Sequence, residues 1–464
     1  MVLMITCTAR KVILWCTFSF PLFSLCYARD SIAANQPIRD SRNETLVSAG
    51  EIFELGFFTP QGSSDTTSSD NRRYLGIWYR NRTISKRRVV VWVANRANPL
   101  TSTNGVFSVT ENGHLELTDE SNGIKYWSEN VGAQKPKLSL ADTGNLALFD
   151  EGGNRSEVRW QSFLQPTDTF LPGMKMADGI QLTSWKSQDD PSPGDFTFET
   201  DPDRENQYII QKGVLNDPYW RSETSGNSQF SFDDISPVIS DWLSNFSSPT
   251  PPPKATGKRG SYDFSSGTRV LKAPDFVNTL LVMNFTGQIQ FIKWEDGVKE
   301  GLVIRSEPRD RCRVLNACGV FSSCNSMNYV PCKCLPGFEP KDSTGWSSGD
   351  FSGGCERKAN LCSEGEAERS FLKLKMVKVG KRGKSAEAEN EDECKTQCLD
   401  CHCDAYSYTN DSLRAATCWI WEGGQGLNTI QEDYMHIDHL EINVHVLLSD
   451  VGKRSVCSLS MNNI

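Results

Sequence analysis

The cysteines of this chain are unevenly distributed, and their positions constrain its fold more than any other feature. Three of the 16 cysteines lie within the first 26 residues, and none occurs between residues 29 and 311. Short, loop-rich segments bury too little apolar surface to fold without cross-links. We therefore predict a front part with its own hydrophobic core and a rear part stapled by disulfides, in an oxidising compartment. The rear cysteines form two groups of six and one isolated residue: Cys312, Cys318, Cys324, Cys332, Cys334 and Cys355; Cys362, Cys394, Cys398, Cys401, Cys403 and Cys418; and Cys457.

Length and charge narrow the class of protein. At about 150 residues per domain, a chain of 464 residues suggests roughly three domains. The net charge of −9 is modestly acidic, whereas nucleic-acid-binding proteins usually carry clustered Lys and Arg. The basic runs at residues 86–88 and 258–259 are isolated, and we interpret them as solvated loop or strand ends. We expect no nucleic-acid partner.

Residues 1–28 have the pattern of a secretory signal peptide. Arg10 and Lys11 supply a positive flank, and small residues surround a cleavage point after Ala28. The apolar run between them, residues 12–26, is too short to span a bilayer, so a membrane anchor is the weaker alternative. Cleavage would also remove the three early cysteines.

The distribution of Asn-x-Ser/Thr sequons agrees with secretion. Six sequons spread along a chain with an entry signal predict a secreted glycoprotein. No later apolar run approaches the ~20 residues that a membrane helix needs, so we expect a released protein. The predicted glycosylation sites are Asn43, Asn81, Asn154, Asn245, Asn284 and Asn410.

Residues 29–300 are predicted to be all-β. Apolar and aromatic residues come in short runs separated by Gly, Asn, Asp and Pro, without a sustained period of about 3.6 residues. Residues 51–58 and 89–93 are strong strand candidates.

An internal repeat supports this prediction. A glycine-containing turn, alternating leucines and an aspartate occur at residues 112–119 and again at 143–150. A weaker pair lies at residues 194–198 and 287–291. Repeated turn–strand units indicate pseudo-symmetric sheets that close on a shared core.

The rear part combines strand patterns with one helix. Residues 391–399 have the pattern of a helix that places Cys394 and Cys398 on one face, four residues apart. Strand candidates lie at residues 371–374, 403–408 and 418–421.

Catalytic and metal-binding patterns are weak. The run from Cys398 to Cys403 has zinc-like spacing, but clustered cysteines in a secreted chain favour disulfides. The five histidines share no catalytic pattern, and residues 349–354 lack the partners of a serine-protease nucleophile. No phosphate-binding loop or kinase catalytic loop occurs. We expect neither an enzyme nor a cofactor or metal.

Several motifs of the front part occur together in one known family. They are LVSAG (46–50), ELGFF (54–58), YLGIWY (74–79), VWVANR (91–96), WQSF (160–163), PTDT (166–169), LPGM (171–174), LTSWK (182–186) and PGDF (193–196). Over about residues 40–446 the chain resembles plant S-locus glycoproteins and the ectodomains of G-type lectin S-receptor-like kinases. The resemblance implies an all-β, multidomain fold. Two tandem β-prism domains of bulb-type lectin kind would be followed by an EGF-like module and a PAN/apple-like α+β domain.

The resemblance also implies the domain boundaries. They are a signal peptide at 1–28, a bulb-type lectin domain at 29–155, a second lectin-like or S-locus glycoprotein domain at 156–305, an EGF-like module at 308–356, a PAN/apple-like domain at 360–447 and an unassigned tail at 448–464. Trp92, Trp127 and Trp160 would meet in the core in and around the first lectin domain, where we interpret them as packing residues rather than a sugar platform.

Six disulfides follow from the resemblance, although six cysteines allow 15 pairings on spacing alone. The implied pairs are Cys312–Cys324, Cys318–Cys332, Cys334–Cys355, Cys394–Cys418, Cys398–Cys403 and Cys362–Cys401. Calcium-binding EGF-like modules carry acidic residues before the first cysteine. Here Arg309 and Arg311 flank Asp310, so we expect no calcium.

The sequence can be compared directly with the mannose-binding motif of bulb-type lectins. The bulb-lectin pocket uses Gln-x-Asp-x-Asn-x-Val-x-Tyr, whose side chains lie on one face of a strand and reach the sugar hydroxyls together. Aligned on the second repeat, this chain offers Ala141, Thr143, Asn145, Ala147 and Phe149; on the first it offers Thr110, Asn112, His114, Glu116 and Thr118. Only Asn145 agrees. We predict a degenerate sugar site, with Asn145 closing a turn.

The predicted function is extracellular recognition. The lectin-like domains would bind a small secreted protein or peptide, as in pollen recognition, self-incompatibility or defence, with the ligand surface between about residues 201 and 294. Trp220 and Trp242 are candidate anchors there, or core residues. A homodimer, or a heterodimer with S-domain receptor kinases, is a further expectation. The alternative is a lectin that recognises mannose-type or microbial glycans.

The end of the chain leaves two interpretations open. The resemblance stops after about Val446, whereas full-length receptors of this family continue into a membrane span and a kinase. We expect the chain to be either a natural secreted form or a truncated receptor kinase. It would be extracellular, or held at the cell surface through a partner. Cys457 makes the mature cysteine count odd, so it is free, bonded to another chain or in a disordered tail.

Overall fold

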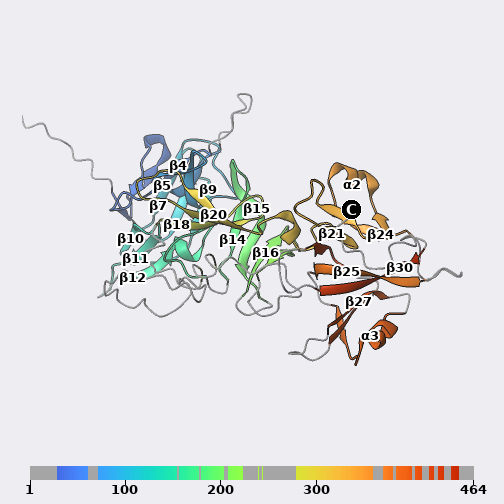
Figure 1. Cartoon of the computed structure of the whole chain (residues 1–464). Helices are drawn as coiled ribbons and strands as arrows, with labels where there is room; N and C mark the ends of the chain where they lie inside the picture. Colours follow the sequence, from blue (N-terminus) through green and yellow to red (C-terminus); the bar gives the residue numbers. More distant parts are fainter. Residues whose placement is uncertain are drawn as a thin grey trace, which may run out of the picture.

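In the computed structural model, the regular structure of the described residues is mostly β-strand, with lectin-like domains at one end and a cysteine-rich part at the other (Figure 1). The predicted all-β, multidomain fold class is confirmed. The residues described are 29–60, 72–153, 156–176, 179–202, 207–222, 239, 243, 278–358, 369–379, 383–399, 403–409, 417–422, 427–432 and 440–448.

Three four-stranded antiparallel sheets form the first lectin-like domain, and the last strand of one of them, residues 157–161, lies beyond the predicted domain end at residue 155. Their inner faces carry alternating Leu, Val, Ile and Phe side chains that are almost completely buried. The strands predicted at residues 51–58 and 89–93 are confirmed as β4 and β6. In spatial order the sheets are β1 (Ser31–Ala33), β10 (Pro136–Leu140), β11 (Leu146–Asp150) and β12 (Glu157–Gln161); β2 (Ile38–Arg39), β7 (Gly105–Val109), β8 (Leu115–Asp119) and β9 (Lys125–Glu129); and β3 (Leu46–Val47), β4 (Phe53–Phe58), β5 (Tyr74–Ile84) and β6 (Arg87–Val93).

Three tryptophans meet at the centre of this domain. Trp92, Trp127 and Trp160 come from β6, β9 and β12, which are the last strands of the three sheets. The ring centroids lie 5.9, 6.0 and 6.1 Å apart, and every pair meets edge to face. Such geometry contributes to packing beyond the area that it buries. The predicted core role of these tryptophans is confirmed.

The turns of the sequence repeat share one backbone geometry. Gly113 and Gly144 have φ values of +80° and +86°, which residues with a Cβ rarely adopt. Each glycine N–H donates to the carbonyl three residues earlier, at 2.9 Å in both turns. Gly287 repeats this turn with φ +88°, but Gly194 lies inside a strand, so the weaker repeat at residues 194–198 is wrong.

The second lectin-like domain contains two described four-stranded sheets. Trp220, Phe198 and Leu281 are fully buried in its core. Trp220 is therefore a packing residue, and its interpretation as a ligand anchor is wrong; Trp242 lies outside the described residues. The sheets are β13 (Thr169–Phe170), β18 (Thr279–Met283), β19 (Ile289–Lys293) and β20 (Leu302–Glu307); and β14 (Leu182–Ser187), β15 (Asp190–Thr200), β16 (Tyr208–Lys212) and β17 (Asp217–Arg221).

The cysteine-rich part is organised by an eight-stranded sheet that crosses the expected domain boundary. β21 of the EGF-like module pairs in parallel with β29 of the PAN-like domain. The division at about residues 356–360 thus describes the cysteine groups but not the sheet. Its order is β22 (Cys332–Cys334), β21 (Ser322–Cys324), β29 (Ile430–Glu432), β25 (Arg369–Val379), β30 (Leu440–Leu447), β27 (Cys403–Thr409), β28 (Thr417–Glu422) and β26 (Lys384–Ala386); β23 (Phe338–Pro340) and β24 (Cys355–Arg357) form a separate pair.

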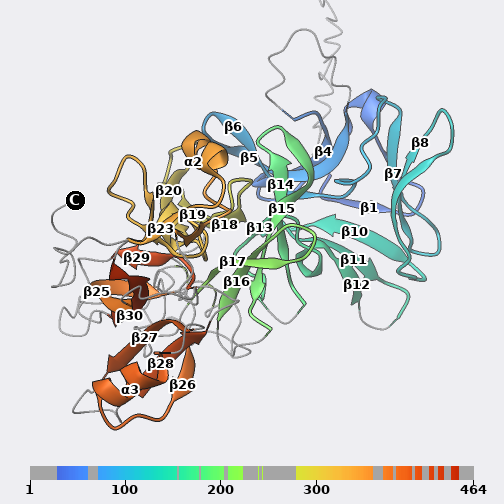
Figure 2. The same cartoon turned by 90° about the vertical axis from the view of Figure 1, so that its right-hand side faces the viewer.

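The helix predicted at residues 391–399 is confirmed as α3 (Glu391–Gln397). The Asn390 side chain caps it by accepting the Glu393 N–H at 2.9 Å, and three acidic residues in the first turn favour the helix dipole. Cys394 and Cys398 are fully buried where α3 contacts β27 and β28 (Figure 2).

The other helical segments whose full ranges lie in the described residues are short. They are α2 (Ser343–Ser348) and the 3-10 turns η1 (Asp40–Arg42), η2 (Ser162–Leu164) and η5 (Arg311–Arg313). No helix in the described part of the chain has the length and apolar character needed to cross a membrane.

Candidate functional site

The degenerate sugar site centres on Asn145, at the start of β11. Its Nδ2 donates to Gln161 Oε1 at 2.8 Å. Its Oδ1 accepts from the Phe163 N–H at 3.3 Å and from the Ser162 hydroxyl at 3.4 Å. The Asn145 amide therefore ties β11 to β12 and η2, and both its oxygen and its nitrogen are already engaged within the protein.

The neighbouring positions on this face offer little to a sugar. Ala147 is 7% exposed and lies between Ser139 and Gln161 of the adjacent strands. Phe149 is half-buried, and Thr143 is exposed in the preceding turn. On the first repeat, Glu116 is bonded to Lys125 at 2.6 Å. The second repeat therefore does not place several free polar side chains around one point, as a hydroxyl-rich ligand requires.

The VWVANR motif joins the two lectin-like domains. Arg96 is 8% exposed, and its guanidinium donates to the carbonyl oxygens of Pro191, Thr183 and Ser184 at 2.7, 3.0 and 2.6 Å. Thr183 and Ser184 lie in β14 and Pro191 lies in β15, so all three carbonyls belong to the β14–β15 hairpin of the second domain. The planar guanidinium can serve several acceptors at once, which an ammonium cannot do in the same geometry.

Burial perturbs the charges at this joint. Burial lowers the pKa of Arg96, and the nearby Asp168 carboxylate partly offsets this shift. Burial raises the pKa of Asp168, against the opposing effects of Arg96 and of the Thr167 hydroxyl, which donates to Asp168 at 3.0 Å. From the sequence, Arg96 was recognised only as part of the VWVANR motif, and its buried position between the domains was not predicted. Its burial depends on a contact with residues about ninety positions later, which local patterns do not show.

The β5–β6 hairpin makes a second contact between the lectin-like domains. The Trp294 indole N–H donates to the Thr83 carbonyl at 3.3 Å, and Arg87 forms an ion pair with Asp189. The Arg88 guanidinium lies 4.4 Å from the centroid of the Trp78 ring. Lys86 and Arg88 are exposed at the start of β6, which agrees with the interpretation of residues 86–88 as a solvated strand end, whereas Arg87 is half-buried in its ion pair. Residues 258–259 lie outside the described part.

Five disulfides link the described cysteines, with the partners that the resemblance implies. They are Cys312–Cys324, Cys318–Cys332, Cys334–Cys355, Cys394–Cys418 and Cys398–Cys403. The sulfurs of Cys318, Cys324 and Cys332 lie within 4.8 Å of one another, but all three are in disulfides and offer no thiolate to a metal. The pair Cys362–Cys401, His402 and Cys457 lie outside the described residues. The Asp310 carboxylate accepts the Cys312 N–H at 2.9 Å and pairs with Arg313 at 3.2 Å.

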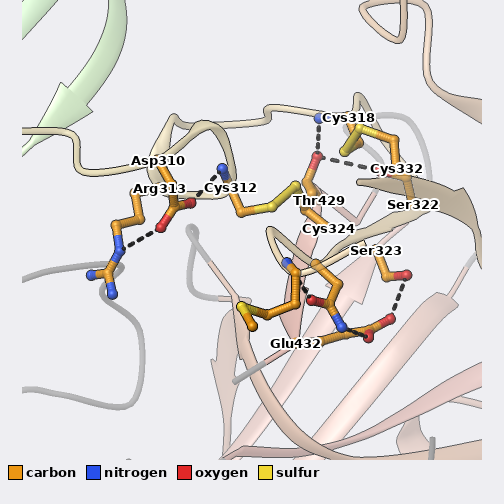
Figure 3. The surroundings of a disulfide bond; sticks show 12 residues. Asp310, Cys312, Arg313, Cys318, Ser322, Ser323, Cys324, Cys332, Thr429 and Glu432 are labelled. Atoms are coloured by element: carbon orange, nitrogen blue, oxygen red, sulfur yellow. Dashed lines mark hydrogen bonds and ion pairs between the residues drawn. A yellow bond between two sulfur atoms is a disulfide. The ribbon is translucent and has the colours of Figure 1, made fainter. Parts of the chain in front are cut away.

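Polar contacts hold the EGF-like module to the PAN-like domain (Figure 3). The Thr429 hydroxyl accepts the Cys318 N–H at 2.9 Å and donates to the Gly319 carbonyl at 2.8 Å. Ser323 and Asn325 donate to the Glu432 carboxylate at 2.9 and 3.0 Å. These bonds flank the parallel β21–β29 pairing and make the two parts one structural unit.

Arg357 forms the other half of this joint. Its guanidinium donates to Asp404 Oδ1 at 3.1 Å and to the His445 carbonyl, and lies 4.8 Å from the Phe338 ring centroid. Burial raises the pKa of Asp404, although Arg357 opposes the shift. His445 is fully buried, stacks on Phe371 at 4.6 Å, and its Nδ1–H donates to the Cys403 carbonyl at 3.1 Å.

Acid is expected to destabilise the PAN-like domain through His445. Burial, together with Arg357 and Arg369, lowers the pKa of His445 below its ordinary 6.5. The unfolded state therefore binds a proton at a pH where the native state does not. The contribution of His445 to the free energy of unfolding is fully present above about pH 6.5. It falls as the pH decreases toward the native pKa, by at most about 1.4 kcal/mol per pH unit. Between pH 7.5 and 5.5, the melting temperature of the unmodified protein should fall more than the melting temperature of the His445→Phe variant. Equal falls in the two proteins would contradict the prediction.

Three of the six sequons lie in the described part. Asn43 and Asn81 are exposed, whereas Asn284 is half-buried in the Gly287 turn, where its Oδ1 accepts the Thr286 N–H at 3.0 Å. The predicted sites Asn154, Asn245 and Asn410 lie outside the described residues. Glycosylation at all six stays a prediction.

Comparison with known proteins identifies the domains. Residues 89–188 match the D-mannose binding lectin family, residues 258–342 the S-locus glycoprotein domain and residues 362–425 the PAN-like domain. A solved monomeric mannose-binding lectin from Gastrodia elata covers 29% of this chain and 96% of its own, with 17% identity and a TM-score of 0.20.

Two curated relatives extend along most of the chain. A G-type lectin S-receptor-like serine/threonine-protein kinase of Arabidopsis thaliana is 43% identical over 425 residues, which are 89% of this chain and 46% of the relative. The chain thus spans about half the length of the receptor kinases that it matches. An S-locus-specific glycoprotein of Brassica oleracea var. alboglabra is 32% identical over 419 residues, which are 87% of this chain and 89% of the relative.

The fold and the family matches define a lectin-like, disulfide-stapled multidomain protein of the kind found in receptor ectodomains. Within that class, the chain belongs to the S-locus glycoprotein family. Membership of this family supports a role in extracellular recognition.

Proposed function

We propose that this protein is a recognition glycoprotein that binds a small secreted protein or peptide outside the cell. Family membership supports this proposal, as do the disulfides, which favour an oxidising compartment. The chain would act as a secreted partner, or as the ectodomain, of S-domain receptor kinases, through homodimers or heterodimers. Cell–cell recognition such as pollen rejection, or defence signalling, is the setting that such a receptor system suits.

We favour a protein or peptide ligand over a sugar because of the contacts at the degenerate sugar site around Asn145. The Asn145 side chain is already hydrogen-bonded to Gln161 and Phe163, and Ala147 stands where the mannose motif has Val. A sugar would have to break these internal bonds without gaining equivalent ones. Protein surfaces need no such pocket, since a few buried anchors supply most of their binding energy.

A glycan array tests this choice against the lectin alternative. We expect the purified glycoprotein to bind no mannose-type or microbial glycan above background. Asn145→Ala should leave that result unchanged while lowering the free energy of unfolding by about 1–2 kcal/mol, because the hydrogen bonds between β11, β12 and η2 are lost. Thr143→Ala, in the same turn but exposed, is the matched control and should leave stability within about 0.5 kcal/mol.

The immobilised glycoprotein should at the same time retain a ligand from a secreted small-protein fraction, and protease treatment of that fraction should abolish retention. Glycan binding that disappears in Asn145→Ala would overturn the proposal in favour of a lectin. Retention that survives protease treatment would do the same.

A further inference from the structure

A groove of about 670 Å³ lies between the second lectin-like domain and the EGF-like module. One wall is the β16–β17 hairpin, with Lys212 and Tyr219, and the other is η5 with the segment that follows it. Clefts between domains are frequent ligand sites, because they expose side chains from independent elements to one volume. None of the family matches assigns a role to this groove.

The walls of the groove are fixed relative to each other. The Leu315 N–H donates to the Tyr219 carbonyl at 2.8 Å, and Gln288 Nε2 donates to the Pro308 carbonyl at 3.0 Å. Phe196 packs edge to face on the Tyr219 ring at 4.9 Å. A ligand would therefore meet a preformed site and lose little affinity to ordering of the protein.

Two cations in the groove rest on aromatic rings. Lys212 Nζ lies 5.7 Å from the Phe196 ring centroid, and the Arg311 guanidinium lies 5.1 Å from that of Phe351. Both side chains belong to exposed residues, and within the described part of the chain neither forms an ion pair with a carboxylate. Aromatic faces hold a cation in place but do not neutralise it.

The two carboxylates that line the groove are engaged in local turns. Asp310 caps η5 and pairs with Arg313. Asp350 Oδ1 accepts the Ser352 N–H at 3.0 Å and its hydroxyl at 2.7 Å. These bonds lower the pKa of Asp350, and Arg311 contributes a smaller part. Burial raises the pKa of Tyr219, and Arg311, which lines the same groove, opposes that shift.

We propose that this groove binds the carboxylate of a peptide, with Lys212 and Arg311 as its cationic contacts and the Tyr219 hydroxyl as a further donor. Pro308, Val314 and Leu315 line the same groove and supply apolar contacts for a neighbouring side chain. The chain as a whole carries a net charge of −9, which repels a free anion at long range. The occupant is therefore a neutral or basic peptide that presents one carboxylate. This inference rests on the proposed function and names a site for its ligand class.

The test is affinity selection from hexapeptide pools on the immobilised full glycoprotein. The pools contain no Asp or Glu, so the C-terminal carboxylate is the only anionic group, and a matched pool is amidated at that end. We expect the free-acid pool to be retained about tenfold more strongly than the amidated pool, as for loss of one charge-assisted hydrogen bond. Lys212→Gln and Arg311→Gln should each lower retention of the free-acid pool by a similar factor.

Asp350→Asn separates this proposal from a general loss of structure. The asparagine keeps the Oδ1 acceptor for Ser352 but removes a negative charge beside Arg311, so retention of the free-acid pool should rise. Arg311→Lys should keep most of the binding, since it keeps the charge. Arg305→Gln, an exposed cation on β20, is the matched control and should change nothing. Melting curves of all variants should coincide.

Equal retention of both pools, no retention at all, or indifference to Lys212 and Arg311 would overturn the proposal. So would preferential binding of tetragalacturonate, which would make the groove a site for acidic sugars. If a small-protein ligand binds the double variant Lys212→Gln/Arg311→Gln with unchanged affinity, the groove is not the binding site, but the proposed function still stands. Absence of any protein or peptide ligand would remove both.

Discussion

Replacing Arg96 by alanine is expected to lower the free energy of unfolding of the lectin-like unit by about 3–5 kcal/mol, the usual cost of removing one partner from a buried charged cluster. Three carbonyl oxygens of the second domain lose their donor, and the buried Asp168 loses the cation that faces it. Denaturant unfolding followed by tryptophan fluorescence measures the loss, since Trp92 and Trp185 lie on the two sides of the joint.

Two variants make the interpretation of Arg96→Ala specific. Arg305→Ala removes an exposed arginine whose guanidinium donates to the adjacent Ile304 carbonyl, and should change stability by no more than about 0.5 kcal/mol. Arg96→Lys keeps the charge but not the planar array of donors, so it should recover only part of the loss. A loss below about 1 kcal/mol in Arg96→Ala would show that the joint does not depend on this side chain.

The Arg96 joint also explains why the VWVANR motif carries adjacent Asn and Arg. The Asn95 side chain accepts the Leu75 N–H at 2.9 Å and donates to the carbonyls of Arg73 and Asn98 at 3.2 and 3.1 Å. It thereby fixes the chain after β6 inside the first domain. The side chain of the next residue, Arg96, then donates hydrogen bonds to the second domain. The Asn–Arg dipeptide therefore fixes the end of β6 in the first domain and connects the first domain to the second.

Sequence reasoning succeeded where the determining interactions are local or repeat along the chain. Short runs of apolar and aromatic residues predicted β4 and β6, and two cysteines four residues apart on one face predicted α3, because each pattern is visible within one element. The repeated Gly113 and Gly144 turns were found for the same reason. Gly194 misled because a glycine before alternating aromatics is compatible with a turn and with a strand interior, and only the strand pairing distinguishes them.

The features that were missed depend on distant contacts. Arg96, Arg357 and Asp404 are charged residues that sequence alone assigns to the surface, yet each is at least partly buried against residues from another part of the chain. The pairing of β21 with β29 brings together residues more than 100 positions apart, and no spacing of cysteines indicates it. The Lys212–Arg311 groove has the same origin, since its walls come from two domains.

Removing the Cys394–Cys418 disulfide is the second large effect that we expect. The two cysteines are 24 positions apart in the sequence, for which loop-closure entropy predicts a loss of about 3.5 kcal/mol when both are replaced by alanine. The matched control is the Cys398–Cys403 pair, with a separation of 5 and an expected loss of about 2 kcal/mol. Both disulfides attach α3 to the sheet, so the comparison varies loop length while the environment stays similar.

Hydrogen exchange should show where the structure opens in Cys394→Ala/Cys418→Ala. Exchange should rise in α3, β26 and β28, which lie at one end of the eight-stranded sheet. The β21–β22 hairpin lies at the other end and keeps Cys312–Cys324 and Cys318–Cys332, so its protection should persist. Uniform loss of protection across the sheet would contradict this and would show that the shared sheet, rather than the separate disulfide groups, sets the unit of unfolding. A larger loss from the short loop than from the long one would contradict the loop-closure argument itself.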